Sequence, residues 1–100
     1  MSSAPLAVML SRSARNIQAY CSTLAQEFGL TLVDIGWHYA SSPDHPEAAY
    51  HLVLSITKPC RALPQFRYTR EQVLGYATDT TKAAIQSEIR QVLEACRDDR

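Results

Sequence analysis

Three histidines with two carboxylates between them form the most suggestive group of side chains in the sequence. The group consists of His38, Asp44, His45, Glu47 and His51. Imidazole nitrogens bind zinc, copper and nickel, and His38 lies opposite His51 if their segments pair as a hairpin. No cysteine or histidine motif of a metal site accompanies them. We therefore favour two rings on a solvated sheet face, and keep a metal-dependent enzyme at His38 and His51 as a second alternative.

A basic stretch with interleaved aromatic residues covers residues 58–70. It has no acidic residue, and its basic and aromatic side chains are Lys58, Arg61, Phe66, Arg67, Tyr68 and Arg70. Guanidinium groups bind phosphate and aromatic rings stack on bases, so all of these except Lys58 are candidate ligand-binding residues. The stretch lacks an RNA-binding or phosphate-loop motif. A phosphate-ligand or RNA-binding module is therefore the first alternative function, and we do not favour it.

The remaining chemically active side chains are scattered. Cys60 lies between Lys58 and Arg61, whose charges favour a thiolate, but no histidine is spaced to act as its base. Asp34 faces Ser55 across the predicted hairpin, and a hydrolase would also need a positioned histidine and a deeper pocket than a small domain offers. We therefore lean toward a protein without enzymatic activity and assign no catalytic residue.

Composition excludes several classes of protein. The 100 residues include ten basic and ten acidic side chains, which argues against a charged surface for nucleic acid or anionic lipid. No apolar stretch has the length of a membrane span, and no secretion signal or cofactor motif is present. An odd number of cysteines without a CxxC pair fits the reducing cytoplasm. Arginine outnumbers lysine eight to two, as is typical of GC-rich bacterial genomes.

The elements that must position these side chains begin with a helix. Its apolar residues follow the spacing of one helical face and are Ile17, Tyr20, Cys21, Leu24 and Phe28. Gly29 supplies the left-handed residue that ends many helices. The same period extends back to Leu6, so the helix can begin near residue 4. Residues 5–10 could instead form a short strand, and we favour the helix.

A hairpin follows, with strands near residues 30–39 and 50–57. Their apolar faces are Val33, Ile35, Trp37 and Tyr39 on the first strand and Tyr50, Leu52, Leu54 and Ile56 on the second. Both apolar faces must point to one side of the sheet. A residue with an odd number on the first strand then pairs with a residue with an even number on the second, so the two numbers sum to an odd value. We favour the register in which this sum is 89. This register pairs Trp37 with Leu52, Ile35 with Leu54 and Val33 with Ile56. Residues 65–68 form either a third strand or a loop.

The last part of the chain is predicted to be helical to about Cys96. Thr69 and Gln72 match the capping box that begins a helix. Gly75 and the run Thr78–Thr81 are poor helix formers, so the helix is either kinked or split near residues 75–81. One domain over residues 1–100 is expected, an α+β two-layer sandwich of an N-terminal helix, an antiparallel hairpin or three-stranded meander, and this C-terminal helix.

A small sheet leaves at least one strand edge unpaired, and small domains commonly pair such edges with another chain. The sequence therefore favours a non-catalytic protein-interaction module whose partner is another protein or a second copy of itself. Nucleic acid is a less favoured partner, and no membrane is expected. No run of residues matches a motif that would identify the activity, and a sandwich of this kind hosts many activities.

Overall fold

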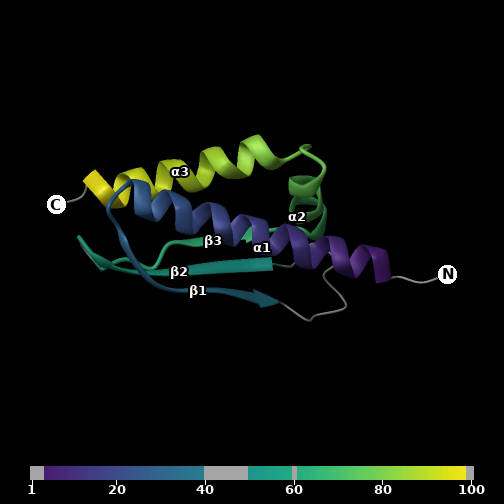
Figure 1. Cartoon of the computed structure of the whole chain (residues 1–100), viewed down its shortest axis with the longest axis horizontal. Coiled ribbons are helices and arrows are strands. Elements are labelled where there is room, and N and C mark those ends of the chain that lie inside the picture. Colours follow the sequence, from purple (N-terminus) through teal and green to yellow (C-terminus); the bar gives the residue numbers. More distant parts are fainter. Residues whose placement is uncertain (1–3, 40–49, 60, 99–100) are drawn as a thin grey trace.

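A helical layer covers one face of a small antiparallel sheet. The computed structural model describes residues 4–39, 50–59 and 61–98. The elements in chain order are α1 (Ala4–Glu27), β1 (Thr31–Tyr39), β2 (Tyr50–Lys58), β3 (Gln65–Tyr68), α2 (Arg70–Ala77) and α3 (Lys82–Asp98). Helices α1 and α3 run along the same side of the sheet and α2 lies near one end (Figure 1). The predicted α+β sandwich is confirmed.

Helix α1 includes residues 5–10, so the helical alternative for that segment is confirmed. At its other end, the Phe28 N–H donates to the Leu24 carbonyl at 2.9 Å, and Gly29 adopts a φ of +69°. This left-handed conformation favours glycine, because a side chain would crowd the backbone. The Leu30 N–H then donates to the Ala25 carbonyl at 2.8 Å, which directs the chain into β1.

The sheet has the strand order β1-β2-β3, so residues 65–68 form the third strand of a meander. From Asp34 opposite Ser55 to Tyr39 opposite Tyr50, the pairing of β1 with β2 follows the predicted register. The alternation of apolar residues on the two strands was therefore sufficient to fix this part of the ladder.

The prediction that Val33 pairs with Ile56 is wrong. Leu32 is the residue opposite Ile56, because β1 contains an irregularity between Leu32 and Asp34 that inserts one extra residue. Such a bulge reverses the alternation on the strand before it. Leu32 consequently packs against the core, whereas Val33 is 59% exposed.

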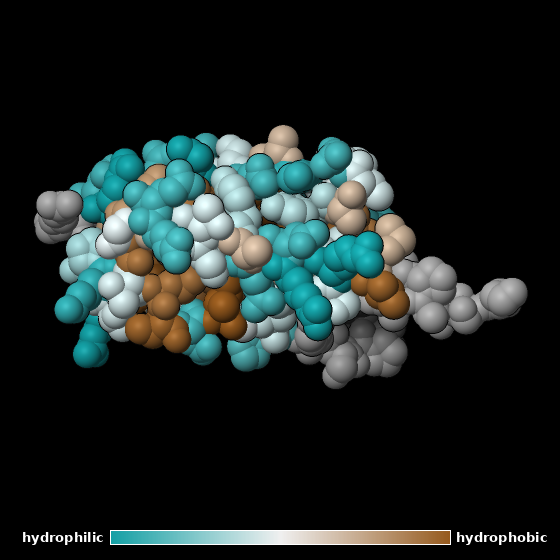
Figure 2. Space-filling model, viewed as in Figure 1, coloured by the Kyte–Doolittle hydropathy of each residue, from teal (hydrophilic) through white to brown (hydrophobic). Residues whose placement is uncertain are grey.

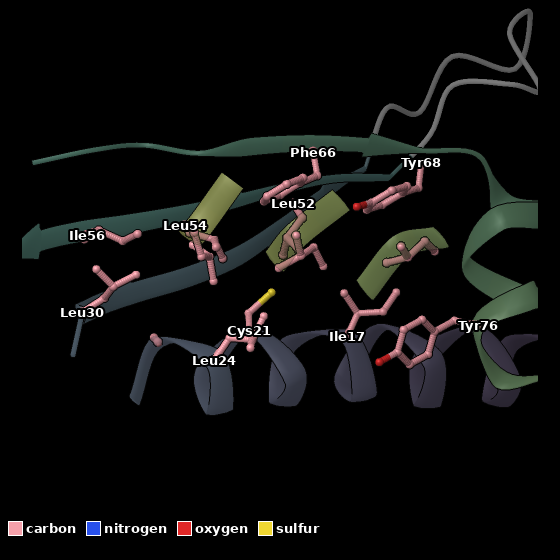
Figure 3. Packing of buried hydrophobic residues seen from close by; sticks show 14 of the residues in the cluster. Ile17, Cys21, Leu24, Leu30, Leu52, Leu54, Ile56, Phe66, Tyr68 and Tyr76 are labelled. Atoms are coloured by element: carbon pink, nitrogen blue, oxygen red, sulfur yellow. The ribbon is translucent and has the colours of Figure 1, made fainter. Parts of the chain in front are cut away.

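The hydrophobic core lies between the sheet and the helices. Ile17, Cys21 and Leu24 of α1 point toward Leu52 and Leu54 of β2 (Figure 3). All five side chains are at most 1% exposed. Ile89 and Leu93 of α3 are fully buried in the same cluster, so the periodic apolar stripes of both long helices meet at the central strand.

The C-terminal helical segment is split, which is one of the two predicted alternatives. The capping box begins α2, with the Gln72 N–H donating to the Thr69 hydroxyl at 3.1 Å and the Thr69 N–H donating to the Gln72 side chain at 2.8 Å. At its end, the Gly75 carbonyl accepts from the Thr80 N–H at 2.8 Å. The Thr81 hydroxyl donates to the Gln72 carbonyl at 2.6 Å, which ties the start of α3 to α2.

Candidate functional site

The face of the sheet away from the helices carries the two predicted metal ligands. His38 lies opposite His51, with ring centroids 6.3 Å apart and planes tilted by 57°. The Nε2 atom of His51 lies 3.0 Å from the Oε1 atom of Gln65, and the two share a hydrogen bond. The structure thus brings the two rings together as predicted.

Two imidazoles alone do not complete a zinc site, which normally has three or four protein ligands. Among the described residues, no group of three His, Cys, Asp or Glu side chains could hold a metal ion. The suggested third ligands, Asp44, His45 and Glu47, lie outside the described residues.

The basic stretch does not form one patch. Arg67 on β3 lies opposite His51, whereas Arg61 lies beside Ala62, which bridges to Ile56. His51 and Ile56 are five positions apart on β2, about 17 Å, so the backbones of Arg67 and Arg61 lie far apart along the sheet. Arg70 is the first residue of α2, and all three arginines are exposed.

The predicted stacking residues of this stretch are core residues. Phe66 is 3% exposed and Tyr68 is 4% exposed, so neither ring offers a face to a base. Residues along β3 alternate between exposed and buried, and Phe66 and Tyr68 occupy the two buried positions, which face the helices. The Tyr68 hydroxyl donates to Glu88 Oε1 at 2.8 Å, and burial, with this contact, raises the pKa of Tyr68. The expectation that these rings bind a ligand does not fit their placement.

The other chemically active groups are also kept apart. Asp34 lies opposite Ser55, but His38 is four positions along β1 from Asp34, about 13 Å away at the usual rise of a strand. That separation places the imidazole beyond hydrogen-bonding reach of the Asp34 and Ser55 pair. Cys60 lies outside the described residues, and burial raises the pKa of Cys21 to about 12, which suppresses its thiolate.

The outer edge of β1 is the feature that offers a surface for binding. Ile56 exchanges two backbone hydrogen bonds with Ala62, and the Leu54 N–H donates to the Pro64 carbonyl, so the backbone groups of these residues point toward β3. Because backbone direction alternates in an antiparallel sheet, Ser55, Val53 and His51 point toward β1.

The same alternation assigns the direction of each backbone group on β1. Asp34, Gly36 and His38 lie opposite Ser55, Val53 and His51. They direct their N–H and C=O groups at β2. Ile35 and Trp37 therefore direct theirs away from the sheet. Within the described part of the chain, β1 pairs only with β2, so this edge is open.

The inner face of β1 is only partly covered by the helices. Leu32, Ile35 and Trp37 are half-buried against the core, whereas Leu52 and Leu54 on β2 are completely buried. Hydrophobic surface is visible over β1 beside α1 (Figure 2). The helical layer is thus centred on β2 and β3 and leaves an apolar strip along the β1 edge.

Trp37 is the largest side chain of this strip. Its Nε1 atom donates to the Ala14 carbonyl at 3.2 Å, and its ring meets that of Tyr50 edge to face at 6.4 Å. It borders an open groove of about 520 Å³ beside α1. The sequence predicted a free edge but could not show that β1 forms it or that its apolar face is half covered. The order of the strands in the sheet, which makes β1 an edge strand, could not be read from the sequence.

No described helix is long and apolar enough to cross a membrane. No family model matches the chain, and no curated protein or solved structure matches it.

Proposed function

We propose that the protein is a non-catalytic interaction module of the cytoplasm that works as a homodimer through the edge of β1. The observation that carries the proposal is that one strand combines an open backbone edge with a half-covered apolar face. Both features belong to Thr31–Tyr39, a strand of nine residues.

The open edge supplies directional bonding. The N–H and C=O groups of Ile35 and Trp37 point away from β2, as shown above, and can pair with an added strand without loss of a bond within the sheet. Exposed edges of this length are usually blocked by proline, lysine or a bulge. The bulge of β1 lies near its start, between Leu32 and Asp34, and the strand contains neither proline nor lysine. Residues 34–39 are therefore suitable for strand addition.

The half-covered face supplies the hydrophobic contribution. An added strand continues the sheet and brings apolar side chains beside Ile35 and Trp37. Burial of apolar surface contributes about 25 cal/mol per Å², so completing the burial of such side chains stabilises the pairing. A second copy offers both the matching edge and the matching strip, as in dimers with a twofold axis, where the same patch meets itself.

Light scattering over a dilution series tests the dimer. We expect the mass to fall from twice 11.2 kDa toward 11.2 kDa as the protein is diluted. Ile35→Pro removes an N–H that points away from β2, so it should block the edge and give 11.2 kDa throughout. Ile35→Val is the matched control and should behave as the unaltered protein. A constant 11.2 kDa for the unaltered protein would refute the proposal.

A further inference from the structure

The outer face of β1 carries an acid and a base arranged symmetrically about a glycine. Asp34, Gly36 and His38 are alternate residues, and all three point away from the helices. Asp34 and His38 are exposed, and a Cβ atom built on Gly36 meets no atom within 4 Å. This short segment is therefore complementary to itself when it is reversed.

Symmetry limits how two copies of β1 can pair. A twofold axis perpendicular to the sheet makes the two strands antiparallel and keeps both helical layers on the same side. Opposed residues must then share a face, so the axis passes midway between a residue and its own copy. For the central part of the strand, the residue at the axis can be Ile35, Gly36 or Trp37.

The positions of Asp34 and His38 distinguish these three registers. With the axis at Ile35, Asp34 opposes Gly36 of the second copy, and with the axis at Trp37, His38 opposes Gly36 of the second copy. Only the register centred on Gly36 places Asp34 opposite His38 of the second copy, and symmetry forms this contact twice. On the inner face, the same register places Ile35 opposite Trp37.

We infer that β1 pairs with β1 of a second copy in the register centred on Gly36, with Asp34 of each copy bound to His38 of the other. This inference rests on the proposed dimer and specifies its partner and contacts. Two three-stranded sheets join into one continuous sheet of six strands, with both helical layers on one face.

The backbone directions agree with this register. Ile35 and Trp37 point their hydrogen-bonding groups outward, so the Ile35–Trp37 pair is the one that exchanges backbone bonds. Asp34 and His38 then form a pair without backbone bonds, in which Cα atoms lie about 4.5 Å apart and side chains are closest. At this spacing the Asp34 carboxylate can accept a hydrogen bond from an imidazole N–H of His38, and such cross-strand pairs stabilise a sheet. At the axis, the two Gly36 residues lie at the same separation and bring no side chain into contact.

Cross-linking through introduced cysteines tests the register. A background of Cys60→Ser and Cys96→Ala leaves Cys21, which is buried and completely inaccessible. In this background, Gly36→Cys should yield an intermolecular disulfide under mild oxidation, because a Cα separation of about 4.5 Å lies within the range of disulfides. Asp34→Cys alone and His38→Cys alone should remain uncross-linked, and an equal mixture of the two should form the mixed disulfide.

The outcomes separate the register from the dimer itself. Light scattering of the unaltered protein reports the dimer, and the cross-links report which residues face each other. If the protein is a dimer but Gly36→Cys does not cross-link, or if Asp34→Cys cross-links with itself as readily as with His38→Cys, the register is wrong and the dimer stands. If no species above 11.2 kDa forms, both proposals fail.

Discussion

Gly75 lies where α2 meets the start of α3, and adding one methyl group there should destabilise the fold. A Cβ atom on Gly75 would lie 2.8 Å from Thr81 Oγ1 and 2.9 Å from Thr81 Cγ2. Real Cβ atoms do not make such contacts, so the Thr81 side chain would have to move. That side chain is held by its hydrogen bond of 2.6 Å to the Gln72 carbonyl.

The effect of Gly75→Ala is the sum of opposing contributions. Overpacking costs about 1–3 kcal/mol, and loss of the Thr81 hydrogen bond costs about 1 kcal/mol more. Alanine in place of glycine inside a helix returns about 1 kcal/mol. We expect a net loss of about 1–3 kcal/mol in the free energy of unfolding, which for a domain of this size lowers the melting temperature by roughly 4–24 °C.

A double-mutant cycle measured by urea denaturation tests this reasoning. Thr81→Ala removes the two nearest atoms and leaves the Thr81 Cβ at 3.3 Å as the nearest contact. In that background Gly75→Ala should be neutral or stabilising by up to about 1 kcal/mol. An equal loss from Gly75→Ala in both backgrounds would show that Thr81 is not the cause.

Three further predictions concern the core. Tyr68→Phe removes a hydroxyl that donates to Glu88 and should lower the free energy of unfolding by about 1–2 kcal/mol in urea titrations; no change would contradict this. Burial raises the pKa of Cys21 to about 12 in the folded protein, whereas the unfolded thiol ionises near 9.0. The free energy of unfolding should therefore fall above pH 9 by up to about 1.4 kcal/mol per pH unit more than in Cys21→Ala. Equal dependence of the free energy of unfolding on pH in the two proteins would refute this prediction. The buried Ser13 hydroxyl has no hydrogen-bond partner among the described residues, so Ser13→Ala should keep or raise the melting temperature, and a clear drop would contradict this.

The register of the hairpin was predictable because two buried faces alternate in phase. The bulge was not predicted, although the sequence carries a signal for it. The apolar residues Leu30 and Leu32 have even numbers, whereas the apolar residues Ile35 and Trp37 have odd numbers. A change of phase within one strand is what an inserted residue produces. Leu32 and Val33 are adjacent and both apolar, so spacing alone assigned the wrong one to the core.

The candidate site was less predictable than the fold. Alternation correctly placed His38 opposite His51, because both lie in the regular part of the ladder. The burial of Phe66 was not predictable, because the sequence did not show which face of β3 the helices cover. The half-covered face of β1 depends on which strands α1 and α3 lie above. Periodicity within a helix shows which of its faces is apolar but not which strand that face covers.

The contact of α1 with α3 also has a consequence for synthesis on the ribosome. The Tyr20 hydroxyl donates to the Gln86 carbonyl across 66 positions of sequence. At about 5–20 residues per second, roughly 3–13 s pass between the synthesis of these two residues. During that interval the apolar stripe of α1, which includes Ile17 and Leu24, has been made but cannot yet be covered by α3. A nascent chain of this protein should therefore be a better client for chaperones than its finished form.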